Sequence, residues 1–92
     1  MSVLVVGVSH KTAPMALLER LALDADGVLK LLTDASGSDH VVEATVVATC
    51  NRLEVYAVVD RFHGSVDELS RLLVERAGEP TEAILQHLYV HY

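Results

Sequence analysis

The single cysteine of this 92-residue chain stands in a polar run, Thr49-Cys50-Asn51-Arg52. A thiol becomes a nucleophile when it loses its proton, and a nearby positive charge favours the thiolate. The guanidinium of Arg52, two residues further on, could supply that charge, and Cys50 could then attack a carbonyl carbon. The alternative is that Cys50 packs as a small buried hydrophobe, which is the commoner role of a free cysteine.

The neighbours of Cys50 have side chains that suit substrate binding. Arg52 can donate two parallel hydrogen bonds to a carboxylate, and Thr49 and Asn51 could donate to a developing oxyanion. Each also has an ordinary structural alternative. Arg52 could pair with Glu54 or lie in solvent, and Thr49 and Asn51 could serve only to form a turn.

Histidines are the other residues that could take part in catalysis or bind a ligand. His10 could act as a general base or hydrogen-bond a substrate carbonyl, or it could be an exposed loop residue, and Lys11 shares this ambiguity. His87 and His91 have the i, i+4 spacing of metal ligands on a helix, but a strand is predicted there and no acidic partner is evident. We therefore expect no metal site, and the chain has no Gly-rich phosphate-binding loop.

The composition indicates one small globular domain. The chain is 51% hydrophobic and 22% charged, with a formal net charge of −6, and its length supports a single core. Because affinity for phosphate comes largely from Lys and Arg, contacts with nucleic acid should be local or made elsewhere. The chain has one cysteine, no signal peptide and no apolar run of membrane-spanning length, so we expect a cytoplasmic protein without membrane contact.

The hydrophobic pattern predicts four strands and four helical segments. The strands are expected at residues 2–8, 41–48, 53–59 and 88–92. The helical segments are expected from Pro14 to Leu21, from Asp26 to Leu32, from Ser65 to Gly78 and from Thr81 to Gln86.

Local signals define several of these boundaries. Residues 65–68 read as a capping box that opens the third helix, and Gly78 closes it, with Pro80 beyond. Residues 34–39 have the composition of a surface loop, and residues 49–52 predict a tight hairpin. Two apolar faces are expected: Val66, Leu69, Leu72 and Leu73 on the third helix, and Leu53, Val55, Ala57 and Val59 on the third strand.

This element order predicts an α+β fold, a ferredoxin-like two-layer sandwich with an antiparallel four-stranded sheet and helices on one face. In this topology the first strand ends at the same edge of the sheet as the hairpin between the second and third strands. We therefore expect His10 and Lys11 to lie near residues 49–52. The start of the last strand, near His87, should face the same end.

Two motifs resemble the N-terminal catalytic domain of glutamyl-tRNA reductases. They are Gly7-Val-Ser-His-Lys-Thr-Ala-Pro14, followed by Glu19-Arg20, and Thr49-Cys50-Asn51-Arg52-Leu-Glu54-Val-Tyr56; the tail Leu88-Tyr-Val-His91 fits as well. The resemblance covers nearly the whole chain. It implies that residues 1–92 form a truncated catalytic, glutamate-recognition domain, and that the NADPH-binding and dimerisation domains lie outside the chain.

The resemblance also implies a reaction, the NADPH-dependent reduction of glutamyl-tRNA to glutamate-1-semialdehyde, which is the first step of tetrapyrrole biosynthesis through 5-aminolevulinate. It makes Cys50 the nucleophile that holds glutamate as a thioester, and it places Thr49, Asn51 and Arg52 in the glutamate pocket. His10, Lys11 and Glu54 are candidate supporting residues.

The family's cofactor and partners are implied in the same way. NADPH is the cofactor of the full-length enzyme, with none bound to this part. Glutamyl-tRNA is the substrate, glutamate-1-semialdehyde aminomutase a partner, and a missing domain forms the homodimer.

Two positions depart from the family pattern, and a second function stays open. Ala48 stands where the family usually has Ser, and Leu18 where it often has Arg. The alternative function is a non-catalytic, ferredoxin-like module that binds a small ligand or another protein. The two hypotheses differ at Cys50, which must be accessible in the enzyme and can be buried in the module.

Overall fold

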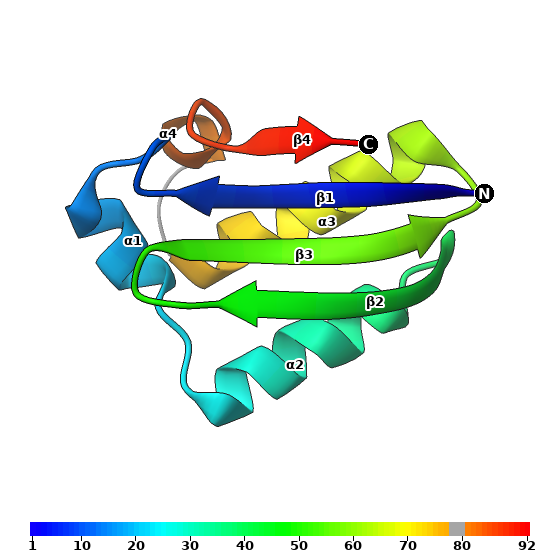
Figure 1. Cartoon of the computed structure of the whole chain (residues 1–92), viewed down its shortest axis with the longest axis horizontal. Helices are drawn as coiled ribbons and strands as arrows, with labels where there is room; N and C mark the ends of the chain where they lie inside the picture. Colours follow the sequence, from blue (N-terminus) through cyan, green and yellow to red (C-terminus); the bar gives the residue numbers. More distant parts are fainter. Residues whose placement is uncertain (78–80) are drawn as a thin grey trace.

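The computed structural model describes residues 1–77 and 81–92 (Figure 1). Its strands are β1 (Ser2–Ser9), β2 (Val41–Ala48), β3 (Arg52–Val59) and β4 (Tyr89–His91). Its helices are α1 (Met15–Leu21), α2 (Ala25–Ser36), α3 (Phe62–Ala77) and α4 (Thr81–Leu85). The predicted order of elements is therefore confirmed.

The four strands form one sheet in the order β2-β3-β1-β4, and each neighbouring pair is antiparallel. Since β1 and β2 both pair with β3, they run in the same direction, and the crossover between them contains α1 and α2. The helices pack on one face of the sheet, and α3 passes behind β1 and β3 in Figure 1. This is the predicted α+β, ferredoxin-like two-layer fold.

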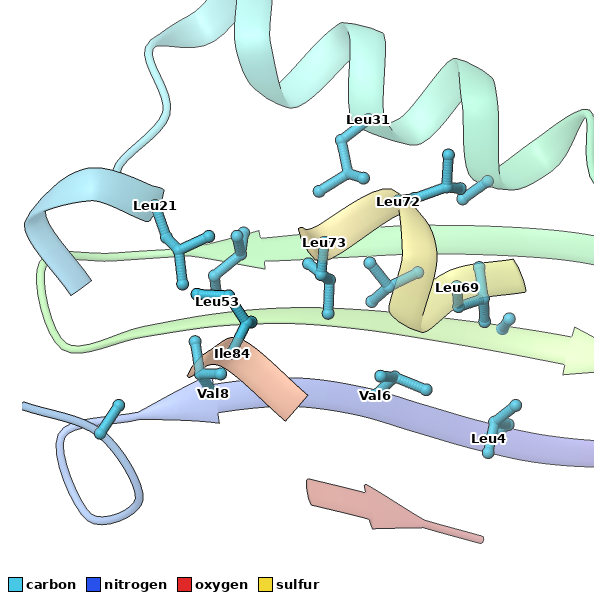
Figure 2. Close-up of a cluster of buried hydrophobic side chains, with 14 of the residues drawn as sticks. Leu4, Val6, Val8, Leu21, Leu31, Leu53, Leu69, Leu72, Leu73 and Ile84 are labelled. Carbon is cyan, nitrogen blue, oxygen red and sulfur yellow. The ribbon is translucent and has the colours of Figure 1, made fainter. Parts of the chain in front are cut away.

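Strand alternation builds the core between the sheet and the helices. The side chains of Leu4, Val6 and Val8 in β1 face the helices, as do those of Leu53, Val55, Ala57 and Val59 in β3, and all are buried. They meet the leucines of α1, α2 and α3, together with Ile84 (Figure 2). Burial of each Val, Leu or Ile side chain among them contributes about 1.5–3 kcal/mol, so this layer is the main source of stability.

The predicted apolar faces are confirmed. All four predicted residues of β3 are buried, and so are Leu69, Leu72 and Leu73 of α3, while Val66 packs partly buried against the core.

Two helix boundaries, the end of α2 and the start of α3, differ from prediction by three residues or more. α2 continues to Ser36, so residues 34–36 are helical and not part of a loop. The reason is Ala35, which is fully buried in the core one turn after Leu31; packing of an apolar face stabilises a helix more than local turn propensity opposes it.

The predicted capping box at Ser65 is wrong. α3 begins at Phe62, whose ring lies 4.5 Å from the ring of Tyr92, so Ser65 lies inside the helix. The Ser65 hydroxyl is buried and has no hydrogen-bond partner among the residues that the structure describes. The predicted helix end at Gly78 and Pro80 lies outside the described residues.

Within residues 1–77 and 81–92, no helix is both long enough and apolar enough to cross a lipid bilayer.

Candidate active site

The β2–β3 hairpin holds the Thr49–Arg52 motif at one edge of the sheet. The N–H of Thr49 donates to the carbonyl oxygen of Arg52 at 2.9 Å, and the N–H of Asn51 donates to Oγ1 of Thr49 at 3.1 Å. Cys50 and Asn51 therefore form the tip of a tight hairpin, as predicted. Thr49 therefore helps to form the turn. Its hydroxyl accepts the hydrogen bond from Asn51, so the hydroxyl proton remains available to donate.

The end of β1 lies against this hairpin. The N–H of His10 donates to the carbonyl oxygen of Asn51 at 2.8 Å, which confirms the predicted neighbourhood. His87 reaches the same end from the approach to β4, because its Nδ1 lies 2.8 Å from the carbonyl oxygen of Thr12. Three segments distant in the sequence are thus joined at one edge.

These segments enclose a hollow of about 800 Å³, which we call the polar pocket. It is lined by Ser9, His10, Lys11, Thr12, Thr49, Asn51, Arg52, Glu54, Tyr89 and His91. Lys11 and Arg52 bring two fixed positive charges into it, although the chain as a whole is acidic. With the carboxylate of Glu54 counted, the lining still carries a net positive charge, so the polar pocket suits an anionic ligand.

Cys50 is exposed, so the alternative of a buried, packed cysteine is wrong. It lines a second hollow of about 270 Å³, which we call the apolar hollow. The apolar hollow is formed by Leu18, Leu21, Ala22, Leu23, Ala48, Thr49, Cys50, Arg52 and Leu53. Leu18, one of the two departures from the family pattern, therefore contributes apolar surface to the hollow that Cys50 lines.

The Thr49–Arg52 motif lies between the two hollows. Thr49 and Arg52 line both of them, whereas Cys50 lines only the apolar hollow and Asn51 only the polar pocket. Ala48 pairs with Leu53, whose side chain is buried on the helix face, and both residues line the apolar hollow where the strands enter the turn.

Glu54 lies at the base of the polar pocket and is only 6% exposed. Its Oε1 accepts a hydrogen bond from the hydroxyl of Tyr56 at 3.2 Å, and its Oε2 accepts one from the hydroxyl of Tyr89 at 2.5 Å. Nη1 of Arg52 lies 3.6 Å from Oε1. The ion pair considered as an alternative role for Arg52 is therefore present.

Burial, with a smaller contribution from the hydrogen bond to Glu54, raises the pKa of Tyr89 well above its ordinary value. The Tyr89 hydroxyl therefore keeps its proton and remains a donor to Glu54 throughout the neutral range.

Sequence reasoning missed two members of this arrangement, Gly7 and Tyr89. Gly7 pairs with Glu54 on one side and with Tyr89 on the other. A Cβ at Gly7 would lie 2.7 Å from Cγ of Glu54 and 2.7 Å from the carbonyl oxygen of Leu53. A glycine inside a strand signals such a close approach, but only the strand register identifies what approaches it.

Among the described residues, no group of three or more His, Cys, Asp or Glu side chains is placed to hold a metal ion. His87 and His91, the pair with metal-ligand spacing, lie before and within β4 and form no such group.

The fold and the site define a ferredoxin-like α+β domain that exposes a thiol beside a positively charged pocket. The family model described as "Glutamyl-tRNAGlu reductase, N-terminal domain" matches residues 6–92. The chain therefore belongs to the glutamyl-tRNA reductase family and matches its N-terminal domain, which confirms the resemblance seen in the motifs.

Curated relatives carry the name of the same family. The chain is 73% identical over all 92 residues to "Glutamyl-tRNA reductase 1" of a Nocardioides species, of which it covers 21%. It is 53% identical over its whole length to "Glutamyl-tRNA reductase" of Streptomyces coelicolor and 51% identical to that of Thermobifida fusca, of which it covers 16% and 19%. The chain thus spans about a fifth or less of the length of these relatives.

Proposed function

We propose that this chain is the glutamate-recognition and acylation part of an NADPH-dependent glutamyl-tRNA reductase. The full-length enzyme would reduce glutamyl-tRNA to glutamate-1-semialdehyde, the first step of tetrapyrrole biosynthesis. Family membership supports the reaction. The observation that carries the assignment of the site is the exposed thiol of Cys50 on a hairpin whose Arg52 reaches into a polar pocket.

The acylation step follows from the chemistry of a thiolate and an ester. The sulfur of Cys50 attacks the ester carbonyl carbon, a C–S bond forms, and the C–O bond to the terminal ribose breaks. The released ribose oxygen takes a proton, and the product is a glutamyl thioester on Cys50. A thioester accepts a nucleophile more readily than the ester from which it was made, so this step prepares the acyl group for reduction.

Arg52 and Thr49 have distinct roles in this proposal. Arg52 binds the side-chain carboxylate of the glutamyl group, because its guanidinium presents several N–H donors in a planar fork. The Thr49 hydroxyl accepts a hydrogen bond from Asn51 and keeps its proton free to donate to the oxyanion that forms on the attacked carbonyl. Asn51 lines the polar pocket and completes the binding surface.

His10 and Lys11 are the proposed supporting groups. Both line the polar pocket, and the backbone of His10 is fixed by its hydrogen bond to Asn51. The imidazole of His10 could deliver a proton to the leaving ribose oxygen. Lys11 would attract the negatively charged end of the tRNA, whose remaining contacts lie outside this acidic chain.

NADPH would supply the hydride that converts the acyl group to an aldehyde. The described residues do not fit its phosphates, since Gly7 packs against Glu54 in the middle of β1 and does not open a helix. We therefore assign NADPH binding to another part of the full-length enzyme. We also propose a cytoplasmic location, a homodimer formed by a further domain, and an aminomutase as the partner that consumes the aldehyde.

A second candidate function is a non-catalytic module that binds a small anionic ligand. The observation in its favour is that Cys50 lines the apolar hollow while the positively charged polar pocket lies on the other side of the hairpin. In that function Cys50 would have no chemical role.

Formation of glutamate-1-semialdehyde distinguishes the two functions. The full-length protein that carries this chain is incubated with glutamyl-tRNA, with and without NADPH, and the aldehyde is quantified. The reductase produces aldehyde only with NADPH and slowly deacylates the tRNA without it. A binding module produces no aldehyde and leaves the tRNA acylated, which would overturn the proposal.

A further inference from the structure

Among the residues whose burial the structure describes, Glu54 is the one charged residue that is buried. An isolated carboxylate is costly to bury, so its surroundings must compensate for the lost water. Two tyrosine hydroxyls do so, one from β3 and one from β4, and each donates to a different carboxylate oxygen. Hydrogen bonds to an ionised acceptor are stronger than those between neutral groups, which makes this an effective replacement.

The strand register makes room for this cluster on the face of the sheet opposite the helices. Gly7 of β1 lies between Glu54 on β3 and Tyr89 on β4. Because Gly7 has no side chain, the carboxylate of Glu54 can reach across β1 to the hydroxyl of Tyr89. Three strands therefore cooperate to fix one carboxylate.

Arg52 lies close to this carboxylate but makes no hydrogen bond to it. The 3.6 Å separation between Nη1 and Oε1 is longer than a hydrogen bond, and the Arg52 side chain is 51% exposed. Both oxygens of Glu54 accept from tyrosines, and at this separation Glu54 attracts the guanidinium by charge while the N–H donors of Arg52 stay available. The guanidinium lines the polar pocket, and no side chain among the described residues accepts a hydrogen bond from it.

We propose that Glu54 is a positioning residue, which Tyr56 and Tyr89 fix so that it holds Arg52 ready to select acyl groups that carry a carboxylate. This inference rests on the proposed function and names its specificity determinant. A glutaminyl group would offer a neutral amide to Arg52 in place of a carboxylate and would lose the charge-assisted hydrogen bonds. A site built for a charged partner rejects such a neutral analogue.

The substitution Glu54→Gln tests the inference because it keeps the size of the side chain and removes its charge. In the full-length protein we expect KM for glutamyl-tRNA to rise about tenfold while kcat changes less than about twofold, since the nucleophile is untouched. The preference for glutamyl-tRNA over glutaminyl-tRNA should fall by a similar factor. Tyr89→Phe should shift KM in the same direction by a smaller factor, because a freed Glu54 oxygen would then compete for Arg52.

Glu43→Gln is the matched control. Glu43 lies on the same face of the sheet, opposite Val58, and is exposed outside the polar pocket. It should leave KM and specificity unchanged, and thermal unfolding of all three variants shows whether each is folded.

The outcomes separate the two proposals. Wild-type protein that reduces glutamyl-tRNA, with unchanged KM and specificity in folded Glu54→Gln and Tyr89→Phe, would overturn the positioning role alone. A loss of kcat at constant KM would also overturn it, because it would indicate a general structural effect. Wild-type protein that fails to react would overturn the proposed function and this inference with it.

Discussion

The two faces of β3 differ in what they require of their residues. On the helix face Leu53, Val55, Ala57 and Val59 are buried among apolar side chains. On the opposite face Arg52, Glu54 and Tyr56 form a chain of polar contacts that ends in the polar pocket. The same eight-residue strand thus supplies both the core and the base of the candidate site.

Because the two faces serve different purposes, stability and chemistry can be altered separately in adjacent residues. A strand places alternate side chains on opposite faces, so a change on the helix face should lower the free energy of unfolding and spare the site. A change on the other face should impair the site and leave the free energy of unfolding nearly unchanged. Gly7 is the exception, because its missing side chain matters to the backbone of β3 and to Glu54 together.

The largest effect is expected at the hairpin tip. Cys50→Ser should lower aldehyde formation by more than about a thousandfold, because a hydroxyl is a far weaker nucleophile than a thiolate. The melting temperature should stay the same, since Cys50 is exposed. Steady-state assays and thermal unfolding check both. Retention of substantial activity would mean that Cys50 is not the nucleophile.

A core substitution should show the opposite pattern. Leu73→Ala removes a fully buried side chain of α3 and should lower the free energy of unfolding by about 3 kcal/mol. The KM of the folded fraction should not change. Urea denaturation followed by circular dichroism gives the first quantity. A specific rise in KM without loss of stability would break the separation of the two faces.

Gly7→Ala should affect stability and site together. The new Cβ would meet Cγ of Glu54 and a backbone oxygen at 2.7 Å, so the strand must shift, at a cost of about 1–3 kcal/mol. Displacement of Glu54 should also raise KM for glutamyl-tRNA. Denaturation and steady-state kinetics on the same preparation measure the loss of stability and the rise in KM.

Gly64→Ala is the control for this substitution. Its Cβ would meet only Cδ2 of His40 at 3.6 Å, an ordinary contact, and the residue lies in α3. Because alanine favours helix more than glycine does, this variant should be slightly more stable, with unchanged kinetics. Equal losses in both variants would show that the contact with Glu54 is not the cause.

The smallest effect should appear in alkaline solution. An unfolded tyrosine ionises near pH 10, whereas burial and Glu54 raise the pKa of Tyr89 in the folded chain. The folded state therefore keeps a proton that the unfolded state releases, and stability falls as pH rises above about 10. Tyr89→Phe should lose less stability than wild type over this range in unfolding measurements. Identical pH dependence would argue against a partly buried Tyr89–Glu54 hydrogen bond.

Much of the framework was predictable because it depends on local patterns. The alternation in β3, the apolar stripe of α3 and the turn residues of the hairpin together predicted the sheet and the meeting of His10 with Asn51. The errors arose where packing outweighed local chemistry: Ala35 extends α2, and Phe62 starts α3 before the apparent cap at Ser65.

The details of the site were harder to predict because they depend on register between distant strands. Tyr89 lies 35 residues after Glu54, and nothing local indicates that its hydroxyl reaches that carboxylate. The face to which each hairpin residue turns depends in the same way on the pairing of Ala48 with Leu53. The motif indicated which residues are present, and only the pairing of strands showed how they divide between the two hollows.

The most direct test is to trap the acyl group on Cys50. The full-length protein is mixed with glutamyl-tRNA in the absence of NADPH, quenched in acid, digested and examined by mass spectrometry. We predict a glutamyl adduct on the peptide that contains Cys50, absent from Cys50→Ser and strongly reduced with glutaminyl-tRNA. An adduct on another residue, or equal labelling by both tRNAs, would contradict a thiol nucleophile served by a carboxylate-selecting Arg52.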